Sequence, residues 1–163
     1  MDTDKFTDLP DWDDERFNAD EEEEGENWKP NLTRESCKAL FGKWQEVVFL
    51  LNGIIAPFME NENDTMLRDT ARDLFTDAHI VGAKIQSSEA GDIYIIRMEN
   101  AAIIRKLAQG IATHLLLFIE DADVDESYVQ VVRNEITEFR KLFIEWVKTF
   151  EKDEFIDEWG LFV

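Results

Sequence analysis

The chain has one cysteine and two histidines, the residue types best suited to nucleophilic or acid–base chemistry near neutral pH: Cys37, His79 and His114. A histidine acts as an acid, base or nucleophile near neutral pH, and a cysteine thiolate is a nucleophile and a metal ligand. Cys37 has no histidine near it in the sequence and lies on an apolar stripe, which predicts a buried thiol. His114 shares a helical stripe with Leu107 and Phe118, which favours a core histidine over a ligand.

Metal sites inside helical bundles use carboxylates from facing helices together with Glu-x-x-His pairs. The residue three positions before His79 is Thr76, and the residue three positions before His114 is Ile111. Neither histidine therefore has the required glutamate. The chain also lacks a Gly-rich phosphate loop, a nucleophile elbow and a Cys–His zinc pattern. We expect no metal, no cofactor and no catalytic site with a recognisable sequence motif.

The run from His79 to Lys84 resembles the motif of the histidine-containing phosphotransfer domain, an acidic four-helix bundle. In that family an exposed histidine within a helix is followed by x-Leu-Lys-Gly. Val81 matches the leucine in kind, but Gly82 and Ala83 stand where the family has lysine and glycine. The resemblance implies that Nε2 of His79 accepts a phosphoryl group from a response-regulator aspartate. Phosphotransfer through His79 is the alternative function for this chain.

Polar residues interrupt the apolar stretches of the last two predicted helices. They are Arg97, Glu99, Asn100, Arg105 and Glu135. We interpret them as a buried network of hydrogen bonds and paired charges, because an unpaired buried charge is costly. In such a network Glu135 would pair with Arg97 or Arg105. The other interpretation is a small polar pocket that binds a ligand.

The first thirty residues form an acidic zone with thirteen acidic and three basic residues, including the run Glu21–Glu24. Such a block is expected to stay solvated and mobile. It nevertheless contains large apolar side chains: Phe6, Leu9, Trp12, Phe17 and Trp28. These either pin the extension to its own domain or form an acidic–aromatic motif that docks a partner. A second apolar segment, residues 153–163, ends the chain with Trp159, Leu161 and Phe162.

The formal charge of −20 on 163 residues excludes several classes of partner. Nucleic-acid backbones and anionic membranes both demand clustered Lys and Arg. The first residues lack a secretory pattern, and no uninterrupted apolar run approaches the ~20 residues of a membrane span. One cysteine is compatible with a reducing compartment. These observations favour a cytoplasmic protein whose partner is another protein, with basic character.

Hydrophobic residues recur at three- and four-residue steps in four segments separated by short polar connections. Residues 31–152 are therefore predicted to form an all-α, up-down-up-down antiparallel four-helix bundle with an acidic N-terminal extension. Asp92–Glu120 is expected to be one continuous helix, and its nearly all-round apolar second half predicts the central position. Thr33, Asp64 and Asp92 are the expected N-caps, and Asp123 with Glu126 has the spacing of a capping box.

Three runs resemble an uncharacterised family of bacterial helical proteins: Met98–Lys106, Arg133–Phe150 and Asp157–Phe162. They cover roughly the C-terminal half of the chain. The resemblance implies a bacterial, helical protein and attaches no activity to it.

These patterns favour a non-enzymatic bundle that binds another protein. The binding residues would lie in the N-terminal extension or in the C-terminal tail. Self-association into a homodimer is one version of this hypothesis, because Leu115, Leu116 and Ile119 exceed what one buried face needs. Mimicry of nucleic acid by the acidic surface is a third hypothesis that rests on charge alone.

Overall fold

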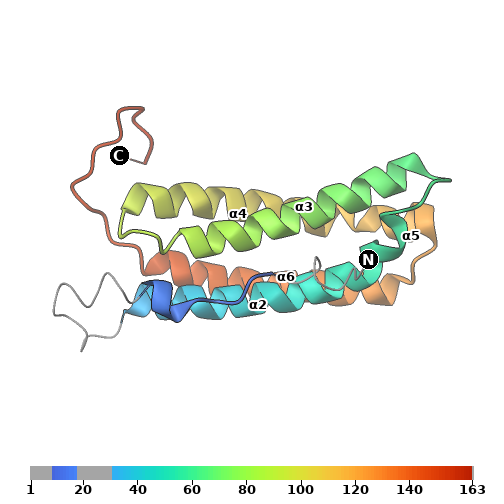
Figure 1. The fold of residues 1–163 in the computed structure, drawn as a ribbon, viewed down its shortest axis with the longest axis horizontal. Coiled ribbons are helices and arrows are strands. Elements are labelled where there is room, and N and C mark those ends of the chain that lie inside the picture. The colour runs from blue at the N-terminus through green and yellow to red at the C-terminus, as the bar shows by residue number, and fades with distance from the viewer. Residues whose placement is uncertain (1–8, 18–30, 163) are drawn as a thin grey trace.

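The chain folds into four long helices packed antiparallel in an up-down-up-down bundle, as the sequence predicts (Figure 1). The computed structural model describes residues 9–17 and 31–162. The long helices are α2 (Leu32–Ile55), α3 (Thr65–Ser87), α4 (Tyr94–His114) and α6 (Glu126–Lys148). The connections contain the 3₁₀ helix η2 (Ala56–Phe58) and the short helix α5 (Leu116–Ala122).

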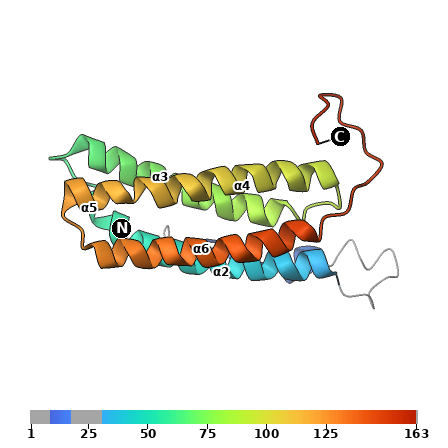
Figure 2. The same cartoon turned by 180° about the vertical axis from the view of Figure 1, so that it is seen from behind.

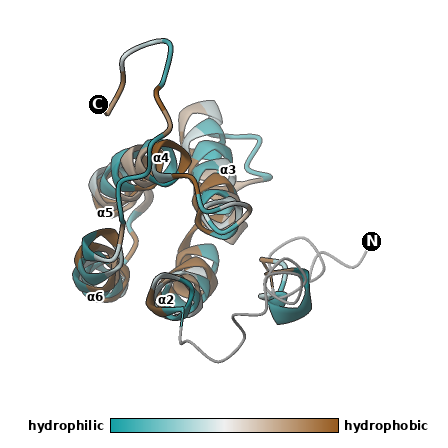
Figure 3. Ribbon diagram, turned by 90° about the vertical axis from the view of Figure 1, so that its left-hand side faces the viewer, coloured by the Kyte–Doolittle hydropathy of each residue, from teal (hydrophilic) through white to brown (hydrophobic). Residues whose placement is uncertain are grey.

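The helices form two layers, α2 with α6 and α3 with α4 (Figures 2 and 3). Helix α2 joins the layers because it packs closely on α3 as well as on α6. Among the adjacent pairs of long helices, α4 and α6 pack least closely. Trp44 fills this junction: its Nε1 donates to the carbonyl oxygen of Ala78 at 2.8 Å. Its ring lies 4.7 Å from that of Phe139. The central helix is therefore α2, and the expectation that residues 92–120 occupy that position is wrong.

The segment predicted as one helix from Asp92 to Glu120 is divided at Leu115 into α4 and α5. Phe118 of α5 lies in the core, where its ring centroid lies 5.2 Å from that of Phe58. His114 is exposed, so the prediction of a core histidine is also wrong. The apolar composition of the second half of residues 92–120 predicted burial on several sides. Leu116 in this part nevertheless keeps 40% of its surface exposed.

The helix ends show which caps the sequence could identify. Asp64 caps α3 as predicted, and α2 stops just before Pro57 as expected of a residue without a backbone N–H. Asn31, rather than Thr33, caps α2. Asp125 caps α6, so the predicted capping box does not form.

The N-terminus of α4 has no cap from its own neighbours, contrary to the prediction for Asp92. Its first residue, Tyr94, donates its backbone N–H to the carboxylate of Asp153 at 2.8 Å. A carboxylate in this position also interacts favourably with the positive end of the helix dipole. The polypeptide beyond α6 therefore completes the start of α4.

Residues 9–17 pack on the outside of α2 and α3 (Figure 3). Leu9 is buried against Gly82 of α3, and the side-chain amide of Gln86 donates to the carbonyl oxygens of Pro10 and Asp11. This short segment extends the core at its surface.

Two stretches, Leu32–Phe58 and Tyr94–Ala122, are long and apolar enough to span a membrane by length and composition. The sequence expectation counted uninterrupted apolar runs and missed both. In the most apolar part of the first stretch, 50% is buried inside the bundle. In the most apolar part of the second stretch, 28% is buried. The buried core helix of a bundle can have the same length and apolar composition as a membrane span.

Candidate functional site

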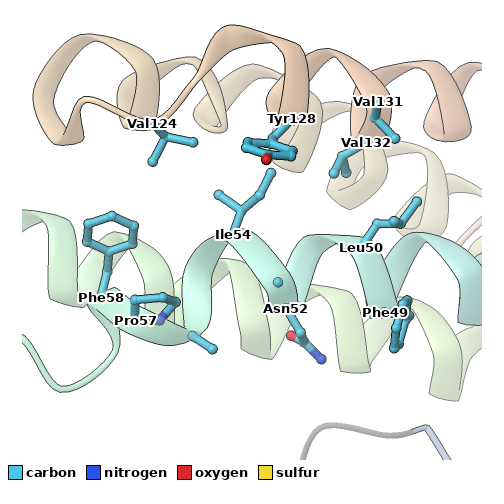
Figure 4. Close-up of a pocket in the computed structure, with 12 residues that line it drawn as sticks. Phe49, Leu50, Asn52, Ile54, Pro57, Phe58, Val124, Tyr128, Val131 and Val132 are labelled. Atoms are coloured by element: carbon cyan, nitrogen blue, oxygen red, sulfur yellow. The ribbon is translucent and has the colours of Figure 1, made fainter.

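A groove with a volume of about 920 Å³ lies between the end of α2 and the start of α6. Figure 4 shows Leu50, Ile54 and Phe58 on one side and Tyr128 and Val132 on the other. We call this hollow the α2/α6 groove. None of its lining residues is charged.

The groove forms because two apolar stripes meet where α2 ends. Leu50 and Ile54 are four residues apart on α2, and the turn at Pro57 brings Phe58 onto the same side. Val124 precedes α6, and Tyr128 follows at the four-residue step that keeps side chains on one face of a helix. The stripe continues to Glu135, which lines an adjoining hollow.

The edge of the groove exposes large apolar side chains. The exposed fractions are 75% for Phe49, 66% for Tyr128 and 46% for Val131. Single exposed apolar residues are normal, but a contiguous apolar patch marks an interaction site or a ligand groove. The arrangement suits burial of an apolar partner.

One end of the groove is bordered by charges. The adjoining hollow is lined by Glu46 and Glu135 together with Phe49 and Leu50. The ammonium group of Lys43 donates to both carboxylates, at 2.9 Å to Glu135. These hydrogen bonds raise the pKa of Lys43 and keep it protonated. Two carboxylates share one cation, which leaves this border negative.

Two of the aromatic residues predicted to bind a partner contact their own bundle instead. Phe17 is buried, and its ring lies 5.0 Å from that of Trp12 and 5.8 Å from the guanidinium of Arg34. Trp12 also packs 5.8 Å from Phe41 of α2. Phe6 and Trp28 lie outside the described residues.

The predicted C-terminal residues are exposed. Trp159 keeps 89% of its surface in solvent, and Leu161 and Phe162 are also exposed. Trp159 and Leu161 line a shallow hollow of about 400 Å³ with Glu99. The tail therefore remains a second candidate surface, at the end of the bundle far from the α2/α6 groove (Figure 1).

The predicted polar network is only partly present. Arg97 and Asn100 are buried, and Asn100 donates to Ser87 at 3.3 Å. Glu99 and Arg105 are exposed, so they do not belong to a buried network. The prediction that Glu135 pairs with Arg97 or Arg105 is wrong, since Glu135 pairs with Lys43.

The acidic partner of Arg97 is Glu89, which sequence reasoning missed. Glu89 follows α3 and is buried, with Arg97 at 3.4 Å and Arg34 at 4.0 Å. Asp92 lies 2.6 Å from the other end of the Arg97 guanidinium. Burial raises the pKa of the Glu89 carboxyl, while Arg97 and Arg34 act in the opposite direction.

Cys37 lies near this cluster and is fully buried, as predicted. Its Sγ donates to the carbonyl oxygen of Ile85 at 3.4 Å. Burial and the negative charge of Glu89 raise the pKa of the thiol well above its usual range. A neutral, enclosed thiol is a poor nucleophile.

The two histidines have unequal access to solvent. Nδ1 of His79 lies 2.8 Å from the carbonyl oxygen of Phe75, which indicates that Nδ1 is the protonated nitrogen. Nε2 is enclosed and has no hydrogen-bond partner in the described chain, and the ring lies 4.2 Å from that of Phe75. A phosphoryl donor could reach Nε2 only after the side chain moves. Among the described residues no group of three or more His, Cys, Asp or Glu side chains could hold a metal ion.

Comparisons with protein-family models, with curated proteins and with solved structures find no match for this chain. By its fold the chain is an all-α four-helix bundle. No family is identified.

Proposed function

We propose that the protein is a non-catalytic helical bundle that binds another protein, and that the α2/α6 groove receives an amphipathic helix of the partner. The supporting observation is an uncharged groove of about 920 Å³ edged by the exposed rings of Phe49 and Tyr128. Helix-in-groove recognition places apolar residues of the incoming helix at i, i+4 and i+7 in such a groove. The resemblance of the C-terminal half to bacterial helical proteins without an attached activity is compatible with a binding role.

The partner helix should carry Lys or Arg beside its apolar stripe. The border of the groove at Glu46 and Glu135 is negative, and the chain as a whole has a formal charge of −20. Such charges raise the association rate of a basic partner and suppress acidic ones. A cytoplasmic protein with a basic amphipathic helix is the expected partner class.

The test is capture of partners from host lysate by the full-length chain and by two variants. The double variant Phe49→Gln, Tyr128→Gln removes the rings at the edge of the groove without touching the core. The matched control, Ile80→Gln with Ile144→Gln, removes exposed apolar side chains elsewhere on α3 and α6. A partner that is retained by the control and lost from the groove variant supports the proposal.

A third variant, Trp159→Gln with Leu161→Gln, tests the C-terminal tail. Loss of the partner from this variant alone would move the binding site from the groove to the tail. Capture of no specific protein by the unchanged chain would contradict the proposal. A second copy of the chain is the alternative partner, and light scattering that shows a concentration-dependent dimer disrupted by the groove variant would identify it.

Phosphotransfer through His79 is tested with the same material, although the enclosed Nε2 does not favour it. A response regulator among the captured proteins, together with an acid-labile phosphoryl label absent from His79→Ala, would support this alternative. An unlabelled wild-type chain would exclude it.

A further inference from the structure

A second groove lies between α4 and α6, on a different side of α6 from the α2/α6 groove. It has a volume of about 460 Å³ and is lined by three arginines, Arg105, Arg133 and Arg140. None of its lining residues is acidic. We call it the α4/α6 groove. Its volume falls in the range of pockets that bind small molecules, about 300–1,000 Å³.

The concentration of positive charge is unusual for this chain, which has 37 acidic residues and 17 basic ones. Arg105 and Arg140 form no ion pair with any carboxylate in residues 9–17 and 31–162. Arg133 donates to the main-chain carbonyl of Ala112 instead of to an acid. With twice as many acids as bases available, a groove with three arginines and no acid leaves its positive charge uncompensated.

The register of the two helices places two of these arginines opposite each other. The contact between Arg133 and Ala112 aligns those positions of α6 and α4. Because the helices are antiparallel, moving seven residues along each reaches Arg140 on α6 and Arg105 on α4. The pair therefore lies at one level of the bundle, about 10 Å from Arg133 along the axis at 1.5 Å per residue. Both arginines line the same groove. Two positive charges that share a groove repel each other, and an anion bound between them replaces this repulsion with attraction.

The rest of the groove supplies an apolar floor. Ala108, Ile136 and Phe139 keep only 5%, 8% and 2% of their surfaces exposed beneath the arginines. Gln109 and Gln130 also line the groove. A suitable ligand has an oxyanion for the arginine pair and an apolar body for the floor.

We propose that the α4/α6 groove binds a small organic anion, with a phosphate or carboxylate group between Arg105 and Arg140 and an apolar portion over Ile136. The planar guanidinium groups suit an oxyanion because each can donate two parallel hydrogen bonds. Nucleic acid does not fit, since the acidic remainder of the surface repels a polyanion. The inference is independent of partner binding at the α2/α6 groove.

The experiment is an NMR titration of the full-length chain with phenyl phosphate, at constant ionic strength maintained with chloride. We expect saturable shifts of the backbone amides of α4 and α6 that line the groove. Titrations with inorganic phosphate and with benzoate separate the contributions of the oxyanion and of the apolar body. Tighter binding of phenyl phosphate than of benzoate would assign a phosphate ligand, and the reverse order a carboxylate ligand.

The variant Arg105→Gln, Arg140→Gln should weaken binding at least about tenfold, because each charge-assisted hydrogen bond contributes substantially to affinity. The control Lys106→Gln, Lys141→Gln removes the same charge from exposed positions outside the groove and should bind within about twofold of wild type. The conservative pair Arg105→Lys, Arg140→Lys keeps the charge and should bind with intermediate affinity; it also provides a second variant if the glutamine pair misfolds. Absence of saturable shifts in the wild type, equal loss in the lysine control, or unchanged binding by the arginine variants would each overturn the proposal.

Discussion

At the scale of single residues, the buried charges around Glu89 are the feature with the largest expected energies. Arg97 interacts with both Glu89 and Asp92, and the Arg34 guanidinium approaches from α2. A buried ion pair is not a strong stabiliser by itself, because both ions lose their hydration. Removing one member, however, leaves the other buried and uncompensated, which is the more damaging change.

We therefore predict unequal effects for the two halves of the pair. Arg97→Met should lower the free energy of unfolding at neutral pH by about 3–5 kcal/mol, because Glu89 then loses its nearest cation. Glu89→Gln should cost less, about 1–3 kcal/mol, since a neutral amide is easier to bury. Urea denaturation of both variants and of the wild type measures the difference.

The pH dependence of Arg97→Met provides the check. Loss of the cation raises the pKa of buried Glu89 further above its unfolded value. An acid with a raised folded pKa stabilises the fold below its unfolded pKa and loses that contribution as pH rises through the folded pKa. The deficit of Arg97→Met should thus be largest near pH 7 and should shrink as the pH falls toward about 4.5. A deficit independent of pH would show that Glu89 is not the group responsible.

Sequence reasoning identified some of these residues and misassigned others for a physical reason. A helical stripe shows which positions face inward, so Cys37, Arg97 and Asn100 were predicted as buried. It does not show which residue of a distant segment lies opposite. Glu89 follows a helix and belongs to no stripe, and the pairing of Glu135 with Lys43 depends on the register between α2 and α6.

At the scale of elements, the N-terminal segment behaves as an added piece of the core. Leu9 occupies the space that a side chain at position 82 would fill: a Cβ on Gly82 would lie 2.8 Å from both terminal methyl carbons of Leu9. Glycine within a helix is otherwise unfavourable by about 1 kcal/mol relative to alanine. The glycine therefore permits the close approach of residues 9–17 to α3.

A double-mutant cycle on Leu9 and Gly82 should separate the helix propensity of position 82 from its packing against Leu9. Gly82→Ala in the wild type displaces Leu9, so the gain in helix propensity is offset by lost packing. In a Leu9→Ala background the same substitution should stabilise the protein by about 0.5–1 kcal/mol. Thermal or urea unfolding of the four proteins gives the coupling energy. Additive effects would show that Leu9 and Gly82 do not contact each other in solution.

A second element-scale prediction concerns the cap of α4. Asp153→Ala removes the acceptor of the Tyr94 N–H and should lower stability by about 0.5–2 kcal/mol, the usual range for loss of an N-cap acceptor. Hydrogen exchange should accelerate in the first turn of α4. Glu154→Ala removes the same charge from the neighbouring exposed position and serves as the control. Equal effects of the two variants would assign the loss to charge alone.

The sequence could not reveal this cap, because Asp153 lies 59 positions from Tyr94. The sequence was sufficient to predict the cap at Asp64, because the carboxylate and the Leu67 N–H that it accepts from are three residues apart. It was also sufficient to predict the end of α2, because the ring of Pro57 acts on the backbone next to it. The break between α4 and α5 at Leu115 has no neighbouring glycine or proline from which it could be predicted. The contact of Phe118 with Phe58, close to this break, joins distant parts of the chain.

At the scale of the whole molecule, the net charge of −20 should destabilise the folded state through self-repulsion. Added salt screens this repulsion over distances beyond about 8–10 Å near physiological ionic strength. We expect the melting temperature to rise between low salt and about 0.3 M sodium chloride, by about 2–4 °C for each kcal/mol gained. Calorimetry at both concentrations measures the change. A decrease would mean that ion pairs such as Lys148–Glu145 outweigh the general repulsion.

The overall architecture was predictable because four apolar stripes with short connections allow few arrangements. The two grooves were not, since each depends on where two helices separate. In the α4/α6 groove, Arg133 and Arg140 lie seven residues apart, a spacing common on solvated helical faces. Only the antiparallel register with α4 brings Arg105 opposite Arg140.

The pairing of α2 with α6 also has a consequence for synthesis. Ile55 ends α2 and Glu126 begins α6, a separation of 126 − 55 = 71 positions. At about 5–20 residues per second, roughly 4–14 s pass between translation of these two positions. During that interval the apolar face of α2 that packs on α6 lacks its partner. Until α6 has been made, α3 is the one long helix that can cover part of this apolar face of α2.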